Sequence, residues 1–448
     1  MTVKEALAKA SDTLKCLVGE GVVAETVSVA REVFPDAKKI VIIADPRTWA
    51  AAGEKVEALF ANAGYETKKH ILEPDGKIFH AEYSYIAEVK DAIVSCSEGV
   101  LPVAVGSGVV NDLVKRASGE LGVGYLVVAT AASVDGYSSF GASLSSPEGA
   151  KQTYACPAPK AIIADINIMR TAPKEMASYG FADLMAKSPA GADWILAAEL
   201  GAAEWHEDAW HIVQDSLGEA IGDAEGVAKG ETATLTRFVE GLMLGGFAMQ
   251  AMQSSRPASG AEHMFSHILD MTHHSFNGDL VSHGAQVGVF TLFMTRFHEA
   301  LLNFDMNSLD VDECVERWPE WNDAGEALVR DVFKDSDFPM LGIEQSKPKW
   351  ETKEALRETL TKAKARWGEI SERLRRQLVP SSEIERRLKV VNAPSCPKDI
   401  GVDNDFIERN ILFAMFMRNR YNALDFAYRI GKLHEFAAKA CAPWKTEK

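Results

Sequence analysis

Residues 99–115, GVLPVAVGSGVVNDLVK, run from a strand pattern through a glycine turn into a helical pattern. The apolar residues 99–105 are typical of a strand that is buried in a parallel sheet. Gly106, Ser107 and Gly108 follow as a tight turn that opens the helix. A strand that leads directly into a helix is the repeating unit of a doubly wound α/β sheet.

The same unit recurs on both sides of this stretch. Strands are predicted at 39–44, 65–72 and 124–129, and helices at 48–63 and 85–95. Ligands of such sheets bind at the carboxyl ends of the strands. The turn at 106–108 falls at such an end and is therefore predicted to hold the phosphates of a dinucleotide.

The turn alone is a weak signal, because it lacks the spacing of the GxGxxG fingerprint. Its small residues would let the backbone approach a pyrophosphate, and the N–H groups of a helix N-terminus favour an anion. Asp112 lies in the first turns of the same helix. It either stabilises the helix dipole or accepts a hydrogen bond from the cofactor.

Five of the eleven histidines lie between residues 254 and 284. His263 and His267 are four residues apart in an apolar run, so a helix would place both on one face. His283 opens the next helical pattern. Neutral imidazole is a common ligand of catalytic divalent metals, and the alternative is that these histidines are buried or capping residues. Their clustering beside a turn of small residues favours a metal site.

A catalytic metal usually takes three protein ligands, so an acidic partner is expected elsewhere in the chain. Asp183 lies in a helical stretch of small apolar residues. A carboxylate in such surroundings is costly unless it is paired or bound to a metal. Asp183 is therefore predicted to be the third ligand, with helix capping as the alternative.

At 448 residues the chain exceeds the usual size of a single domain. We predict an α/β dinucleotide-binding domain with a mostly parallel sheet at 1–172, followed by an all-α domain that binds metal and substrate at 173–448. The formal net charge of −16 argues against a nucleic acid or an anionic membrane as partner.

The six cysteines are scattered without a CxxC pair, which predicts a reduced, cytoplasmic protein. The first 21 residues show the pattern of an amphipathic helix that contains acidic residues. Neither a signal peptide nor a membrane-spanning helix is predicted.

Four motifs in the same order resemble those of the metal-dependent alcohol dehydrogenase and dehydroquinate synthase-like superfamily. More closely, the chain resembles sn-glycerol-1-phosphate dehydrogenases of the bacterial AraM-like type. The motifs are GSGVVNDLVK at 106–115, TAASVDGYSS at 130–139, GFADLMAKSPAGADW at 180–194, and RPASGAEHMFSH at 256–267 with SHGAQVGVFT at 282–291. The resemblance implies a dehydroquinate synthase-like fold.

It also implies roles for single residues. Asp183, His263 and His283 would hold one divalent metal, while His267 and Asp135 would face the substrate as catalytic residues. The implied dinucleotide-binding residues are Asp45, Gly106, Ser107, Gly108, Asp112, Thr130 and Ser139. An acid at Asp45 can bond a ribose 2′-hydroxyl and would repel a 2′-phosphate, so NAD(H) is predicted over NADP(H).

One departure from the superfamily bears on the metal. Its iron-dependent members carry a histidine four residues after the ligand aspartate, where this chain has Lys187. The departure predicts zinc or nickel rather than iron. Lys160, Lys187 and Arg256 are candidate cations for a substrate phosphate.

The implied reaction is the NAD(P)H- and metal-dependent reduction of dihydroxyacetone phosphate to sn-glycerol 1-phosphate, and its reverse. The partner would be a small phosphorylated polyol or ketone, and the chain would form a homo-oligomer, a dimer or larger. Alternatives are a dehydrogenase of another polyol, hydroxyalkyl phosphate or phosphonate, a dehydroquinate synthase-like cyclase, and a non-catalytic protein that binds nucleotide or metal.

Overall fold

The computed structural model of the chain describes residues 1–73, 79–96, 98–146 and 151–446. Contacts between residues divide the chain into two compact units. The first comprises Met1–Leu184, Glu207–Ala258 and Val390–Ala393, and the second comprises Met185–His206, Ser259–Lys389 and Pro394–Lys448. The domain boundary that the sequence placed between residues 172 and 173 stays a prediction.

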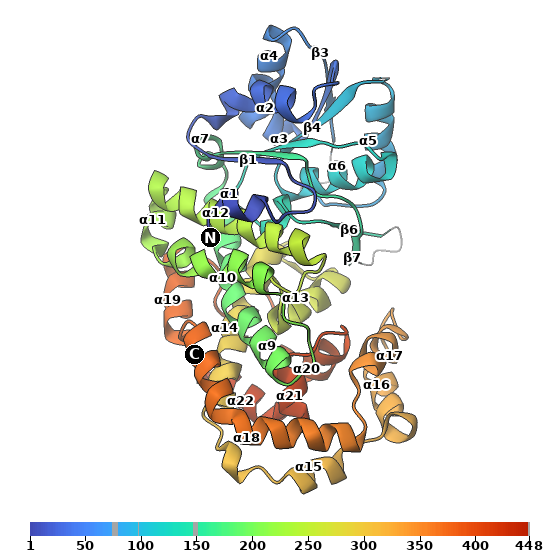
Figure 1. Ribbon diagram of the computed structural model, residues 1–448, viewed down its shortest axis with the longest axis vertical. Coiled ribbons are helices and arrows are strands. Elements are labelled where there is room, and N and C mark those ends of the chain that lie inside the picture. Colours follow the sequence, from blue (N-terminus) through green and yellow to red (C-terminus); the bar gives the residue numbers. More distant parts are fainter. Residues whose placement is uncertain (74–78, 97, 147–150, 447–448) are drawn as a thin grey trace. The chain divides into compact units, whose positions relative to one another are not determined.

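The first unit is built on a six-stranded sheet in which all neighbouring strands are parallel (Figure 1). Across the sheet the strands are β1 (Lys15–Gly19), β8 (Ala161–Asp165), β5 (Leu126–Ala129), β4 (Val100–Gly106), β2 (Lys39–Ala44) and β3 (Glu66–Ile71). This sheet confirms the predicted α/β class with a mostly parallel sheet.

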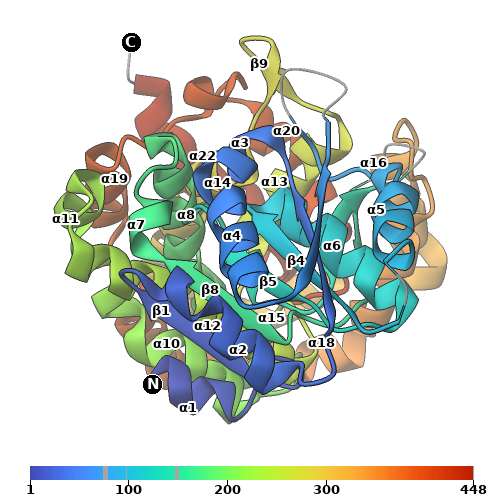
Figure 2. The same cartoon turned by 90° about the horizontal axis from the view of Figure 1, so that it is seen from above.

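Helices cover both faces of the sheet, which is why its inner strands are apolar without alternation. Ile40 and Ile42 of β2 share a buried cluster with Val29 of α2 (Thr26–Val33) and Phe60 of α4 (Glu54–Asn62). Alternate residues of a strand point to opposite faces. The other face is covered by α5 (Tyr85–Val94) and α6 (Gly108–Leu121), which contact β2 and β4 (Figure 2).

The remaining helices of the first unit include a long apolar one, α12, which packs against α10 and β1 (Figure 1). These helices are α1 (Val3–Leu7), α3 (Pro46–Thr48), α7 (Ile166–Met169), α8 (Lys174–Met185), α10 (Glu207–Ile221), α11 (Ala224–Lys229) and α12 (Thr232–Met252). A hairpin of β6 (Ala142–Ser145) and β7 (Lys151–Tyr154) completes this unit.

The second unit is helical apart from a short hairpin, β9 (Ser275–Phe276) and β10 (Asp279–Leu280), within the described part of the chain. Its helices are α9 (Lys187–Glu199), α13 (Ala261–Met271), α14 (His283–Leu302), α15 (Val311–Arg317), α16 (Glu326–Phe333), α17 (Leu341–Ser346), α18 (Lys353–Gln377), α19 (Ser381–Val390), α20 (Phe406–Phe416), α21 (Ala423–Arg429) and α22 (Leu433–Thr446). α13 packs against α14 and α20. The α/β domain is thus followed by helices, as predicted.

Over the described ranges, no helix is both long and apolar enough to cross a membrane. None of the six cysteines forms a disulfide bond within the described ranges.

The N-terminal helix that the sequence pattern predicted is wrong beyond Leu7. Residues Lys15–Gly19 form β1, which pairs in parallel with β8. A helical period in a short segment carries no information about a pairing partner that lies far along the chain. Here the tertiary partner decides the conformation.

Candidate active site

Three of the predicted cofactor positions lie at one edge of the sheet. Asp45 directly follows β2, Gly106 ends β4, and Thr130 directly follows β5. The strand β4 lies between β2 and β5. The amide of Thr130 donates to the carbonyl of Gly106 at 3.1 Å. The structure therefore brings these predicted positions to the carboxyl edge, where ligands of such sheets bind.

The helix α6 begins at Gly108, the last residue of the glycine turn. Its N-cap residue, Ser107, makes no side-chain capping bond. The first N–H groups of the helix have no intrahelical acceptor and can bind a phosphate. Gly106 also has a packing role, because a Cβ atom there would lie 2.4 Å from Cβ of Val110. The close packing of β4 on α6 therefore requires glycine at position 106, whether or not a phosphate binds there.

Asp45 caps the short helix α3. Its Oδ1 atom accepts hydrogen bonds from the amides of Arg47 at 2.8 Å and Thr48 at 3.0 Å. Its second oxygen makes no hydrogen bond within the described ranges. The carboxylate thus keeps one acceptor for a ligand while it caps the helix.

Asp112 and Ser139 lie in a polar network around Lys115, a role that the sequence did not reveal. Lys115 is fully buried, and its Nζ atom lies 2.8 Å from the Gly136 carbonyl and 3.2 Å from the Asp112 carboxylate. Asp112 also accepts from the amide of Ser143 at 3.1 Å. These contacts tie the loop after β5 to α6. Cofactor contacts of Asp112 and Ser139 stay predictions.

Asp135 and Asp183 are neighbours in the first unit. The backbone N–H of Asp135 donates to Oδ2 of Asp183 at 3.3 Å, and Asp183 is 1% exposed. Two glycines permit this approach. A Cβ at Gly180, on α8, would lie 2.1 Å from the carbonyl oxygen of Ala132. A Cβ at Gly245, on α12, would lie 3.2 Å from Oδ2 of Asp135.

The three predicted histidines form a cluster in the second unit. His263 and His267 lie one turn apart on α13, and His283 is the first residue of α14. The centroid of the His263 ring lies 5.3 Å from that of His283 and 6.4 Å from that of His267. The spacing of four residues therefore places both α13 imidazoles toward His283. His273 and His274 precede β9, outside this cluster.

Glu262 orients the imidazole of His263. Its carboxylate is fully buried, and Oε1 lies 2.7 Å from Nδ1 of His263. The same oxygen accepts from the amide of Gly260 at 2.6 Å. With Nδ1 engaged by a carboxylate, Nε2 is the ring atom that would bind a metal.

A hydroxyl and an amide orient His283. Ser266 Oγ donates to Oε1 of Gln286 at 2.7 Å and lies 3.0 Å from Nδ1 of His283. Because its hydrogen points to Gln286, the hydroxyl oxygen accepts from the His283 ring. Gln286 in turn donates to the carbonyl of Val281 at 2.9 Å. Because Nδ1 of His283 is engaged in this way, its Nε2 is likewise the ring atom that would bind a metal.

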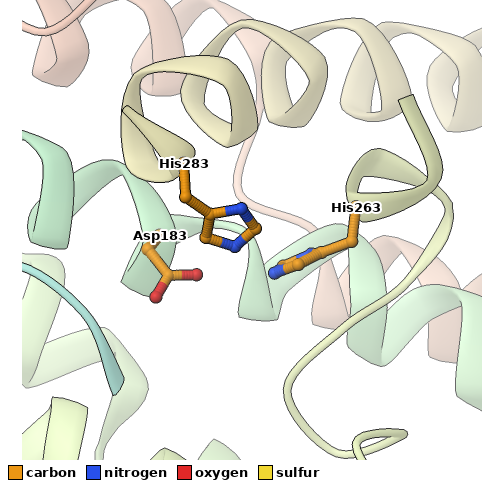
Figure 3. A group of neighbouring side chains, drawn as sticks. All are labelled: Asp183, His263 and His283. Carbon is orange, nitrogen blue, oxygen red and sulfur yellow. The ribbon is translucent and has the colours of Figure 1, made fainter. Parts of the chain in front are cut away.

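Asp183, His263 and His283 come together. Each offers one ligand atom, and these atoms lie within 4.8 Å of one another. Figure 3 shows the carboxylate and the two imidazoles turned toward one another. One carboxylate and two imidazoles form a donor set that catalytic zinc sites use, with further positions open. The residues therefore fit a divalent metal.

His267 is not one of the three candidate ligands, and its ring contacts the guanidinium of Arg418. Its Nε2 atom lies 3.3 Å from an Nη atom of Arg418. A guanidinium carries only donors, so the imidazole accepts this bond. Burial and the neighbouring Arg418 lower the pKa of His267 well below its usual value. His267 is thus a neutral imidazole beside the candidate ligands.

Of the three cations considered for a substrate phosphate, Lys160 can be placed relative to the glycine turn. The amide of Lys160 donates to the carbonyl of Tyr125 at 3.0 Å, and its carbonyl accepts from Leu14 at 2.9 Å. Both partners precede strands, so Lys160 lies at the amino edge of the sheet, opposite the glycine turn. Lys187 and Arg256 are buried.

Known proteins resemble this chain in sequence. The family model of iron-containing alcohol dehydrogenases matches residues 17–173. Glycerol-1-phosphate dehydrogenase [NAD(P)+] from Haloarcula marismortui is 32% identical over 283 residues, which are 63% of this chain and 76% of that protein. The enzyme of that name from Thermococcus kodakarensis is 32% identical, over 63% of this chain and 77% of its own.

A solved structure supports the fold. The crystal structure of glycerol dehydrogenase from Schizosaccharomyces pombe aligns with a TM-score of 0.60 at 14% identity, over 98% of this chain and 95% of that one. At 14% identity this structure shows the fold alone, whereas the two sequence relatives at 32% identity show the family. With these matches, the chain belongs to the NAD(P)-dependent glycerol-1-phosphate dehydrogenase family of metal-containing alcohol dehydrogenases.

Proposed function

We propose that the chain catalyses the NAD(P)H-dependent reduction of dihydroxyacetone phosphate to sn-glycerol 1-phosphate, and the reverse reaction. Asp183, His263 and His283 would hold the metal. The observation that carries the proposal is the convergence of these three side chains in a member of this family.

A bound divalent metal supplies a Lewis acid for the substrate oxygen, and a nicotinamide supplies or accepts the hydride. The protein's part is to hold the ligands and the substrate. Glu262 and Ser266 fix the two imidazoles, and the amide of Asp135 holds the Asp183 carboxylate. The side chain of Asp135 would bind a substrate hydroxyl, and His267 would orient the substrate as a neutral imidazole.

Membership of the family implies NAD(P) as cofactor and a bound metal. Zinc or nickel is proposed over iron, because Lys187 stands where the iron-dependent enzymes have a histidine. The metal content and activity of protein reconstituted with each ion would test this preference. A homo-oligomer in the cytoplasm also stays a prediction.

The direct test is oxidation of NADH by the metal-loaded protein with dihydroxyacetone phosphate, followed by chiral analysis of the product. The proposal expects sn-glycerol 1-phosphate and little of its enantiomer. Faster turnover of another polyol, hydroxyalkyl phosphate or phosphonate would contradict it. Absence of NADH oxidation with every substrate of this panel would favour a cyclase or a binding protein.

The Asp45→Asn variant should relax the preference for NADH over NADPH. Asparagine keeps the capping bonds to Arg47 and Thr48 but removes the negative charge that would repel a 2′-phosphate. We expect the ratio of kcat/KM for NADH to that for NADPH to fall roughly tenfold, equivalent to about 1.4 kcal/mol. The exposed Glu54→Gln variant is the control, and an unchanged ratio in Asp45→Asn would place the ribose elsewhere.

The Glu262→Gln variant should bind the metal more weakly. The amide is similar in shape but is a poorer partner for Nδ1 of His263, so the ring is less basic and less well held. We expect the dissociation constant of the metal, measured by competition with a chelator, to rise about 10- to 100-fold. A dissociation constant equal to that of the wild type would show that Glu262 only stabilises the start of α13.

A further inference from the structure

Arg418 is a cation beside the imidazole cluster, and the described part of the chain supplies no acidic partner for it. It follows the end of α20, and within the described ranges its guanidinium makes one hydrogen bond, to Nε2 of His267 at 3.3 Å. No carboxylate of the described residues forms an ion pair with it. Burial lowers the pKa of this guanidinium, and no acidic neighbour offsets the effect.

Two other arginines of the same unit, one buried and one partly buried like Arg418, are paired with carboxylates. Arg429 is 3% exposed and lies between the carboxylates of Glu351 and Asp425. Arg296 contacts Glu385 at 2.7 Å. A guanidinium that is partly withdrawn from water beside an imidazole and without a counter-charge is less favourable than a paired one, so Arg418 is suited to bind an anion from outside the chain.

The surroundings of Arg418 favour an anion further. The charge of Arg420 also acts on the His267 ring, and its guanidinium donates to the carbonyl of Ser259 at 2.5 Å. His267 accepts from Arg418 and stays neutral, so it orients the guanidinium without competing for the anion. The remaining donors of a planar guanidinium match two oxygens of a phosphate.

The position also suits the substrate. His267, the partner of Arg418, lies one turn along α13 from His263, with ring centroids 6.4 Å apart. In dihydroxyacetone phosphate a single methylene group separates the reacting carbon from the phosphate ester oxygen. An anion on Arg418 would therefore belong to the same small molecule whose oxygen lies at the candidate ligands.

We infer that Arg418 binds the phosphate of the substrate and selects phosphate esters over unphosphorylated polyols; this inference rests on the proposed function. Of the three cations that the sequence suggested for this role, Lys160 lies at the amino edge of the sheet, while Lys187 and Arg256 stay predictions.

The test compares dihydroxyacetone phosphate with dihydroxyacetone in the metal-loaded enzyme. In Arg418→Met, kcat/KM for the phosphate ester should fall about 10- to 100-fold, as expected for a lost charge-assisted hydrogen bond, and much less for dihydroxyacetone. Arg418→Lys keeps the charge and should recover part of the loss. Arg409→Met, an exposed arginine of α20 that pairs with Asp403, is the matched control.

Calorimetry with sn-glycerol 1-phosphate and with glycerol, at saturating NAD, separates the two proposals. Selective loss of phosphate-ester binding in Arg418→Met supports the inference even if the wild type does not turn over dihydroxyacetone phosphate, in which case only the proposed function fails. An equal loss of activity toward both substrates would overturn it, because Arg418 would then act through His267. Unchanged binding of the phosphate ester by folded Arg418→Met would overturn it as well.

Discussion

The Asp183→Asn variant is expected to lose its metal and, with it, about 10³-fold or more in kcat/KM. The asparagine side chain can still accept the hydrogen bond that the amide of Asp135 donates at 3.3 Å, so the local fold should persist. The negative ligand is lost, and a metal contributes several kcal/mol of charge stabilisation to such reactions, each 1.4 kcal/mol being worth about a factor of ten. Metal content and steady-state kinetics measure both effects.

Glu175→Gln is the matched control, because Glu175 is an exposed acid on the same helix α8. It should leave metal content and rate unchanged. If Asp183→Asn retained one metal ion per chain at the wild-type affinity, Asp183 would not be a ligand. Loss of metal with an unchanged unfolding temperature would place the effect at the site rather than in the stability of the helix.

The inner strands β2, β4 and β5 could be predicted from sequence because they are short, apolar and separated by helical patterns, whereas the inner strand β8 was missed. The strand β2 occupies Lys39–Ala44, the range that the pattern predicted. The strand β1 could not be predicted, because its place at the sheet edge depends on pairing with β8. Its partly exposed residues lack the continuous apolar run that marks a buried strand.

The candidate ligands were predictable from spacing and from an unusual setting. His263 and His267 share a helix face because they are four residues apart, and Asp183 stood out as an acid in an apolar helix. Their supporting residues were missed, although a signal existed. Ser266 and Gln286 are polar residues in apolar helices, one turn after His263 and His283, although Ser266 contacts His283 rather than the histidine of its own helix.

Arg418 and Lys115 could not be predicted in this way. The carbonyl partners of Lys115 come from the loop after β5, and the partner of Arg418 lies on α13, which is 151 residues away in the chain. Only the tertiary structure shows that Lys115 is paired with carbonyls and a carboxylate, whereas Arg418 contacts an imidazole. Their charge is evident from the sequence, whereas their surroundings depend on tertiary structure.

The Gly180→Ala variant should be both less stable and less active than the wild type, although alanine favours a helix more than glycine does. A Cβ atom at this position would lie 2.1 Å from the carbonyl oxygen of Ala132 and 2.9 Å from its carbonyl carbon. These are backbone atoms, so α8 or the loop after β5 must move by about 1 Å to reach normal contact distances. Overpacking of this kind costs about 1–3 kcal/mol.

The displacement should reach Asp183, because this residue lies one turn after Gly180 and meets the same loop through the amide of Asp135. A misplacement of about 1 Å can cost roughly 10²-fold in rate, so kcat/KM should fall by that order together with metal affinity. Gly218→Ala is the control, because Gly218 lies on the exposed side of α10 and a Cβ atom there would have no neighbour within 4 Å. Alanine at that position should be neutral or stabilise by up to about 1 kcal/mol. Wild-type activity and metal content in Gly180→Ala would mean that the close approach of α8 to Ala132 does not position Asp183.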